Sequence, residues 1–159
     1  MKKLVAVLLT AYSAVTYGHS GTDAPELMNL EILAAEFAWD FDSKITVEKI
    51  TDDLYVLFGV GGNIGVSVGE DGVFIVDDQF PRLMPKIKAA IADLGGVNID
   101  FAVTTHWHFD HAEGNLSLGP EGTWLVAHEN SREMMKVDRI INLVQFAYEQ
   151  KAYPESAWP

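Results

Sequence analysis

Three of the five histidines of this 159-residue chain lie within six residues, in the segment TTHWHFDHAEGN at residues 104–115. The core of the segment contains His106, His108, Asp110 and His111. Imidazole and carboxylate groups are side chains that zinc takes as ligands. Four such groups directly after an apolar run are costly to bury unless something binds them. The segment therefore predicts a metal site rather than a histidine-rich turn.

The spacing of the first two histidines predicts how they are arranged. Residues 100–105, DFAVTT, are typical of a strand, and α/β proteins place ligands at the carboxyl ends of such strands. Alternate residues of an extended chain face the same way, so His106 and His108 can converge on one ion while Trp107 faces the other side. Either histidine alone would more simply be a structural residue.

The second pair of candidate ligands follows where the chain must turn. Asp110 and Glu113 have the spacing of a helix-start capping box, and Asp110 alone would more simply be a helix cap. A turn at this point directs Asp110 and His111 away from the first pair. One short segment can therefore supply two neighbouring metal positions.

The first half of the chain has the pattern of a β-meander. Short β-branched and aromatic runs are separated by turn formers such as TDD and GEDG. We expect four strands, in ITVEKI, LYVLFG, NIGVSVG and VFIVDD, between residues 45 and 78. The glycine-rich GVGGNIG at 59–65 lacks a phosphate-loop lysine and is expected to be a tight turn.

The second half alternates helical and strand patterns, which predicts an α/β fold. Residues 81–96 carry an apolar stripe at helical spacing, with Pro81 near the start and glycines past the end. Strands are expected in DFAVTTH and TWLVAH. A final helix is expected over residues 129–153, with an apolar stripe from Met134 to Phe146.

The N-terminus has the layout of a secretory signal peptide. Lys2 and Lys3 precede an apolar run from Leu4 to Val15, and small residues follow near Gly18 and Ser20. The run is shorter than the roughly 20 residues that span a bilayer. We expect a signal peptide at residues 1–20 and a periplasmic or secreted product with no membrane attachment after cleavage.

The charge and cysteine content exclude some partners and ligands. The chain has 23 acidic and 11 basic residues and a formal net charge of −12, so nucleic acid is not an expected partner. It has no cysteine, so it forms no disulfide, and any metal must rely on histidine, carboxylate or water ligands.

The segment His106-Trp107-His108-Phe109-Asp110-His111 resembles the HxHxDH signature of the metallo-β-lactamase superfamily. The family also has an aspartate at the end of an apolar strand, similar to GVFIVDD here, and we match it to Asp77, with Asp78 as the second choice. AEGN after the signature and VAHEN at 126–130 are similar as well. The resemblance extends over roughly residues 45–130 and is expected to continue to the chain end.

The resemblance implies a fold, a metal and a role for each residue. The fold is the N-terminal half of a four-layer αβ/βα sandwich. His106 and His108 would ligate the first of two zinc ions, and Asp110 and His111 the second, with Asp110 also taking part in catalysis. Asp77 would accept hydrogen bonds that hold the ligand loop. A hydroxide held between the zinc ions would attack a carbonyl or phosphoryl centre.

The sequence departs from the family pattern after the signature. A complete member supplies two later histidines and a bridging carboxylate, whereas only His128 follows His111 here, at an expected strand end. We expect an N-terminal extension at 21–44 and a partial, truncated domain at 45–159, because a single layer of strands would leave an apolar face exposed. The alternative is a genuine short product that borrows its missing ligands.

These observations lead to two classes of function. The first is a zinc-dependent hydrolase that acts on a small-molecule ester, lactone, thioester or β-lactam, with a β-lactamase like those of subclass B3 as a narrower alternative. The second is a non-catalytic metal-binding remnant or interaction module. Two or three ligands bind zinc weakly, so the chain by itself is expected to be a poor catalyst.

Overall fold

The computed structural model describes residues 25–143 and 146–159. The expected signal peptide, together with residues 21–24 of the expected extension, lies outside the described residues. Within the described part of the chain, none of the helices is long and apolar enough to cross a bilayer.

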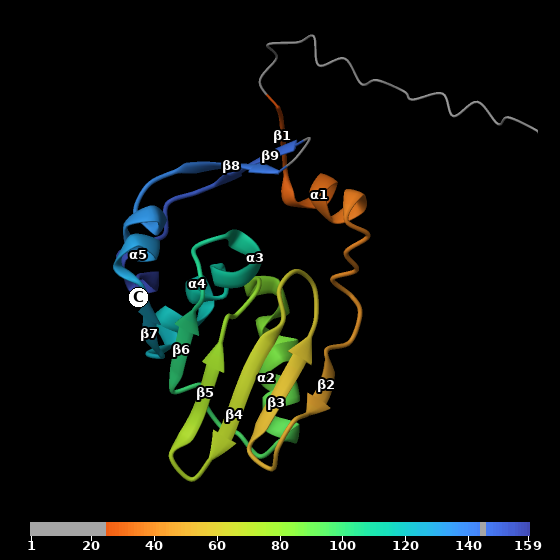
Figure 1. The fold of residues 1–159 in the computed structure, drawn as a ribbon, viewed down its shortest axis with the longest axis vertical. Helices are drawn as coiled ribbons and strands as arrows, with labels where there is room; N and C mark the ends of the chain where they lie inside the picture. The colour runs from red at the N-terminus through yellow and green to blue at the C-terminus, as the bar shows by residue number, and fades with distance from the viewer. Residues whose placement is uncertain (1–24, 144–145) are drawn as a thin grey trace, which may run out of the picture.

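A six-stranded sheet forms the centre of the structure, with strand order β2-β3-β4-β5-β6-β7 (Figure 1). The strands are β2 (Thr46–Lys49), β3 (Leu54–Phe58), β4 (Ile64–Gly69), β5 (Gly72–Val76), β6 (Phe101–Thr104) and β7 (Trp124–Ala127). Neighbours from β2 to β5 are antiparallel, and those from β5 to β7 are parallel. The expected meander and the two later strands are confirmed.

Helix α2 (Met84–Asp93) packs on one face of this sheet, behind the strands in Figure 1. It follows a single 3-10 turn, Pro81–Leu83, and Leu83, Ile87 and Ile91 of the expected stripe are at most 2% exposed. They meet alternate residues of the strands, among them Ile75. The expected helix at 81–96 is confirmed. Its apolar stripe packs in the core because side chains on one face of a helix recur about every 3.6 residues, and those on one face of a strand recur every two residues.

The opposite face of the sheet carries a row of uncovered apolar side chains. Phe74, Phe101 and Trp124 are directly opposite one another on β5, β6 and β7, and they are 40%, 44% and 72% exposed. Their strand neighbours Val73 and Ala102 point to the core. The described chain thus has one covered and one bare apolar sheet face, as expected for a single layer of strands.

The C-terminal region differs from the single helix expected over 129–153. Helix α5 (Glu129–Met135) ends early, and a hairpin of β8 (Arg139–Leu143) and β9 (Phe146–Gln150) follows. Ile140 is exposed and Ile141 buried, which is the alternation of a strand. The helical expectation is therefore wrong after Met135, since isoleucine pairs favour strands once a partner strand is present.

The N-terminal segment lies against the hairpin. Strand β1 (Glu26–Met28) pairs in parallel with β9, and helix α1 (Leu30–Glu36) follows, where the side chain of Asn29 accepts a hydrogen bond from the Ile32 amide at 2.9 Å. The described residues of the expected N-terminal extension thus contain a short strand and a short helix. Trp39 then packs beside Phe109 of residues 104–115, the segment that carries the candidate ligands and is called the ligand segment below.

Candidate metal centre

The candidate ligands lie at the carboxyl ends of β5 and β6, which are parallel neighbours. The chain leaves β5 at Asp77 and leaves β6 at Thr105, directly before His106. Two short helices follow, α3 (Phe109–Ala112) and α4 (Asn115–Leu118), and a 3-10 turn at Gly119–Glu121 leads to β7. The two loops meet because parallel neighbouring strands end at the same edge of a sheet.

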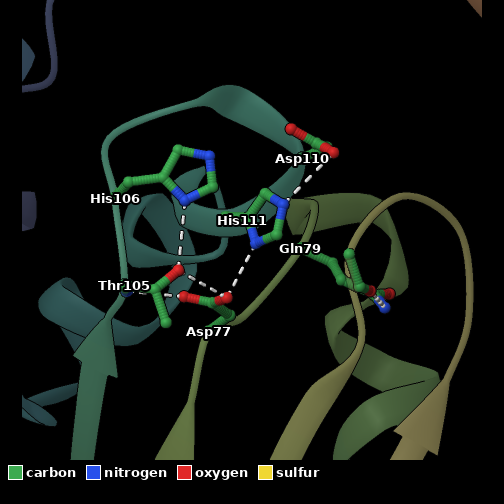
Figure 2. Close-up of polar contacts among 7 residues, drawn as sticks. Asp77, Gln79, Thr105, His106, Asp110 and His111 are labelled. Atoms are coloured by element: carbon green, nitrogen blue, oxygen red, sulfur yellow. Dashed lines mark hydrogen bonds and ion pairs between the residues drawn. The ribbon is translucent and has the colours of Figure 1, made fainter.

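Asp77 holds both ends of the ligand segment (Figure 2). Its carboxylate accepts hydrogen bonds from the Thr105 amide at 2.7 Å and the Thr105 hydroxyl at 2.9 Å, and it lies 2.7 Å from His111 Nδ1. Asp77 is only 5% exposed, and its φ of 63° is in the left-handed region. A strained backbone with a buried carboxylate at a strand end is typical of a functional position.

The hydrogen bonds of Asp77 also determine which ring nitrogens are free. Carboxylate oxygens accept, so the Thr105 hydroxyl gives its proton to Asp77 and accepts one from His106 Nδ1, 3.1 Å away. His111 Nδ1 donates to Asp77 directly. Both imidazoles therefore carry their proton on Nδ1 and keep Nε2 free as a lone-pair donor.

The expected ligands are neighbours in space. The ring centroids of His106 and His108 are 4.7 Å apart, and those of His106 and His111 are 4.2 Å apart. Asp110 Oδ2 lies 3.5 Å from His111 Nε2 (Figure 2). The second pair thus adjoins the first, whereas the sequence suggested that it would point in a different direction.

The surroundings of the histidines shift their pKa values in opposite directions. Burial, followed by the charge of the neighbouring histidines, lowers the pKa of His106 and of His108 below the ordinary value. The hydrogen bond to Asp77 raises the pKa of His111, against an opposing effect of burial. His106 and His108 therefore favour the neutral form that ligates a metal, while His111 holds its proton more tightly.

The candidate ligands are of the types that zinc binds, but too few of them converge to complete a zinc site. Imidazole and carboxylate are zinc ligands, and free Nε2 atoms are the usual donors. Among residues 25–143 and 146–159, no three His, Asp or Glu side chains are grouped so that they could hold a metal ion by themselves. A zinc site needs three or four ligands, so the described residues supply part of a donor set.

The loop between β3 and β4 closes over the second pair of candidate ligands. The Gly62 amide donates to the Asp110 carbonyl at 3.2 Å, and the side-chain amide of Gln79 donates to the Gly62 carbonyl. A Cβ on Gly62 would collide with the His111 ring. The expected turn at 59–65 is confirmed, and Gly62 is required because the imidazole occupies the space of a side chain.

Replacing Gly62 with alanine is expected to displace the His111 imidazole. We expect zinc to bind about 10- to 100-fold more weakly, the usual effect of disturbing a group that orients a ligand. The matched control is Gly69→Ala, because a Cβ there meets nothing within 4 Å. Competition titration with a chromogenic chelator measures both variants, and equal affinities would show that Gly62 does not position His111.

Asp78, the second choice for the matched aspartate, occupies a different place. Its carboxylate is fully buried with no hydrogen-bond partner among the described residues, and burial raises its pKa well above the ordinary value. It contacts the ligand segment through its amide, which donates to the His111 carbonyl at 2.9 Å. The side chain that contacts Thr105 and His111 is therefore that of Asp77.

The expected capping box at Asp110 is wrong. The N-cap lies two residues earlier, at His108, so helix α3 begins at Phe109, and no side chain caps it. Phe109 is 3% exposed, and its burial places the helix start. Glu113 instead faces Tyr148, whose hydroxyl donates to it at 3.3 Å, and burial raises the Glu113 pKa to about 7.

His128 lies outside the group of candidate ligands. It follows β7, caps helix α5 and accepts a hydrogen bond from the Asn130 amide on Nδ1 at 3.1 Å. It is exposed. Thr105 and Gly62, in contrast, contact the ligands without having been singled out from the sequence, because threonine after a strand and glycine in a turn have ordinary structural explanations.

No protein-family model and no curated protein matches this sequence. Solved structures do match. BJP-1, a subclass B3 metallo-β-lactamase of Bradyrhizobium japonicum, is 26% identical with a TM-score of 0.53, over 60% of this chain and 38% of its own. FIM-1 from Pseudomonas aeruginosa, solved in a mono-zinc form, is 23% identical with a TM-score of 0.53, over 60% of this chain and 46% of its own.

A third structure is described as the first B3 metallo-β-lactamase with an active-site glutamic acid. It is 21% identical with a TM-score of 0.59, and the match covers 74% of this chain and 45% of that enzyme. The chain thus spans less than half of each of the three structures. The order of strands, the bare sheet face and these matches agree with one architecture. The chain has the metallo-β-lactamase fold and comprises the N-terminal portion of its αβ/βα sandwich.

Proposed function

We propose that the protein containing this chain is a zinc-dependent hydrolase of small molecules. The observation that carries the proposal is the gathering of His106, His108, Asp110 and His111 at one sheet edge, with Asp77 directing two of the imidazoles. Such a donor set has little use in a protein that binds no metal, because polar groups packed together without a partner are costly.

Each residue would have a separate task. His106 and His108 would hold one zinc through neutral imidazoles, and Asp110 and His111 would hold a second. Zinc supplies Lewis acidity and makes water reactive near neutral pH. Asp77 keeps the proton of His111 on Nδ1 and away from the metal side. Asp110, whose carboxylate lies beside His111 Nε2 and whose carbonyl accepts from the Gly62 amide, would help to orient the reacting groups.

We propose that the remaining ligands come from the second half of the sandwich. The row of Phe74, Phe101 and Trp124 offers that half an apolar surface to pack on. Zinc would then reach its usual coordination, and the site would lie between the two halves. The chain by itself is expected to bind zinc weakly.

The proposed substrates are small esters, lactones, thioesters or β-lactams. The structural matches include metallo-β-lactamases, which supports β-lactams as one member of this group. The net charge of −12 disfavours nucleic acid. The basic and apolar start of the sequence supports export to the periplasm or exterior.

A non-catalytic metal-binding module is the second candidate function. It is favoured by the small number of donors, since no three of them among the described residues form a ready-made site. Such a module would bind zinc and lack hydrolytic activity even in the intact protein.

The test is metal content together with a substrate panel. Protein purified without chelator is expected to hold about two zinc ions per complete site and to hydrolyse at least one chromogenic ester, lactone, thioester or β-lactam. Chelation should abolish the activity, and added zinc should restore it. Zinc binding without any turnover would favour the module, and activity that survives chelation would contradict the proposal.

A further inference from the structure

Gln150, the last residue of β9, reaches the ligand segment from the other end of the described chain. It is 1% exposed. Its Nε2 donates to the Trp107 carbonyl at 2.8 Å and to the Tyr153 hydroxyl at 3.2 Å. Both N–H groups of this buried side-chain amide therefore donate hydrogen bonds, and one of them donates to the backbone between His106 and His108.

The Trp107 carbonyl belongs to the peptide group that joins Trp107 to His108. A hydrogen bond to this oxygen fixes the plane of the peptide, and the plane sets the direction in which the His108 side chain leaves the backbone. Beyond it, the His108 carbonyl accepts from the amides of His111 and Ala112, each at 3.0 Å. The Gln150 bond is therefore the long-range contact that controls the backbone between the first two candidate ligands.

The ligand segment is consequently held from two sides. Asp77 binds Thr105 before His106, and Gln150 binds Trp107 after it. The Trp107 side chain is partly buried and contacts both apolar clusters, so the tryptophan is constrained at its ring as well as at its carbonyl. Two anchors on either side of one histidine restrict its position more than either does alone.

The anchor itself is rigid because Gln150 lies in paired structure. Gln150 is opposite Arg139 in the β8–β9 hairpin, and Tyr153 is 3% exposed. The Tyr153 amide donates to the Met135 carbonyl at 2.8 Å, and its own carbonyl accepts from the Trp158 indole at 2.8 Å. The amide of Gln150 thus projects from a fixed frame onto a loop that has no strand partner of its own.

We propose that Gln150 is a positioning residue for the candidate metal centre: its hydrogen bond to the Trp107 carbonyl sets the spacing of His106 and His108. The inference rests on the proposed function, because it concerns zinc at those two histidines. Under this proposal, the β8–β9 hairpin contributes to metal binding, although it carries none of the candidate ligands.

The test compares Gln150→Met with Tyr153→Phe in the purified protein. Methionine keeps the length of the side chain and removes both donors, whereas Tyr153→Phe removes the other acceptor and leaves the Trp107 bond in place. Zinc affinity is measured by chelator competition, and Co²⁺ substituted for zinc reports ligand geometry through its visible spectrum. The thermal midpoint of the metal-free protein checks folding.

We expect Gln150→Met to weaken zinc binding about 10- to 100-fold and to change the Co²⁺ spectrum, while Tyr153→Phe stays close to wild type in both. Gln150→Leu serves as a second donor-free variant. Wild-type affinity and spectrum in a folded Gln150 variant would overturn the inference. Failure of both Gln150 variants to fold would also overturn it, by assigning the residue to fold stability. Failure of the wild type to bind zinc would instead overturn the proposed function.

Discussion

Replacing His106 and His108 together with alanine is expected to abolish zinc binding at the first position and to reduce turnover at least about 10³-fold. Zinc and its ligands supply several kcal/mol of transition-state stabilisation, and each 1.36 kcal/mol is about tenfold in rate. Burial lowers the pKa of both histidines and so favours the neutral imidazole, the form that binds metal. Zinc content by atomic absorption and initial rates on the best substrate measure the result.

His128→Ala is the matched control for this variant. The chemical change is the same, but His128 is exposed and caps helix α5, where its Nδ1 accepts a hydrogen bond from the Asn130 amide. We expect full zinc content and a loss of about 1 kcal/mol in the free energy of unfolding, the usual cost of losing a helix cap. Unchanged zinc in the double variant would rule out the assignment of these two histidines as ligands.

Asp77→Asn is expected to lower both the stability of the fold and the affinity for zinc. Asparagine suits the test because it tolerates the left-handed backbone at this position, whereas alanine would add strain. Asparagine keeps one accepting oxygen and puts an NH2 group in place of the other. The oxygen Oδ2 alone accepts from both the Thr105 hydroxyl and His111 Nδ1, so we expect a loss of about 2–3 kcal/mol in the free energy of unfolding. The tautomers of His106 and His111 are no longer set, and zinc should bind about 10- to 100-fold more weakly.

The pH dependence separates the Asp77 contact from a general loss of packing. Because the hydrogen bond to Asp77 raises the pKa of His111 in the folded chain, its contribution to stability is complete below the ordinary pKa of 6.5 and is lost as pH rises through the raised value. In metal-free protein, the stability difference between wild type and Asp77→Asn should therefore shrink as pH rises from about 6 upward. Denaturant unfolding at several pH values measures this, and a difference independent of pH would contradict the role given to the His111 pair.

Much of the architecture around the site followed from local sequence patterns. The alternation in residues 45–78 predicted four strands, and the stripe of Leu83, Ile87 and Ile91 predicted the helix that covers them. These predictions succeeded because residues buried on one element repeat at the period of that element. The prediction of a final helix over residues 129–153 was wrong because it rested on a local pattern alone. Strand β9 pairs with β1, more than 100 residues earlier, and a local pattern does not contain that partner.

By itself, the sequence determined the types of the candidate ligands, their spacing after an apolar strand and the α/β order of the elements. Only the tertiary structure decided how the ligands are held. Asp77 reaches His111, Gly62 makes room for the same ring, and Gln150 bonds the Trp107 carbonyl. Each of these contacts joins residues that are more than 30 positions apart in the chain. Hydrogen bonds and close packing over such separations depend on how strands and loops meet in space, which no short-range periodicity encodes.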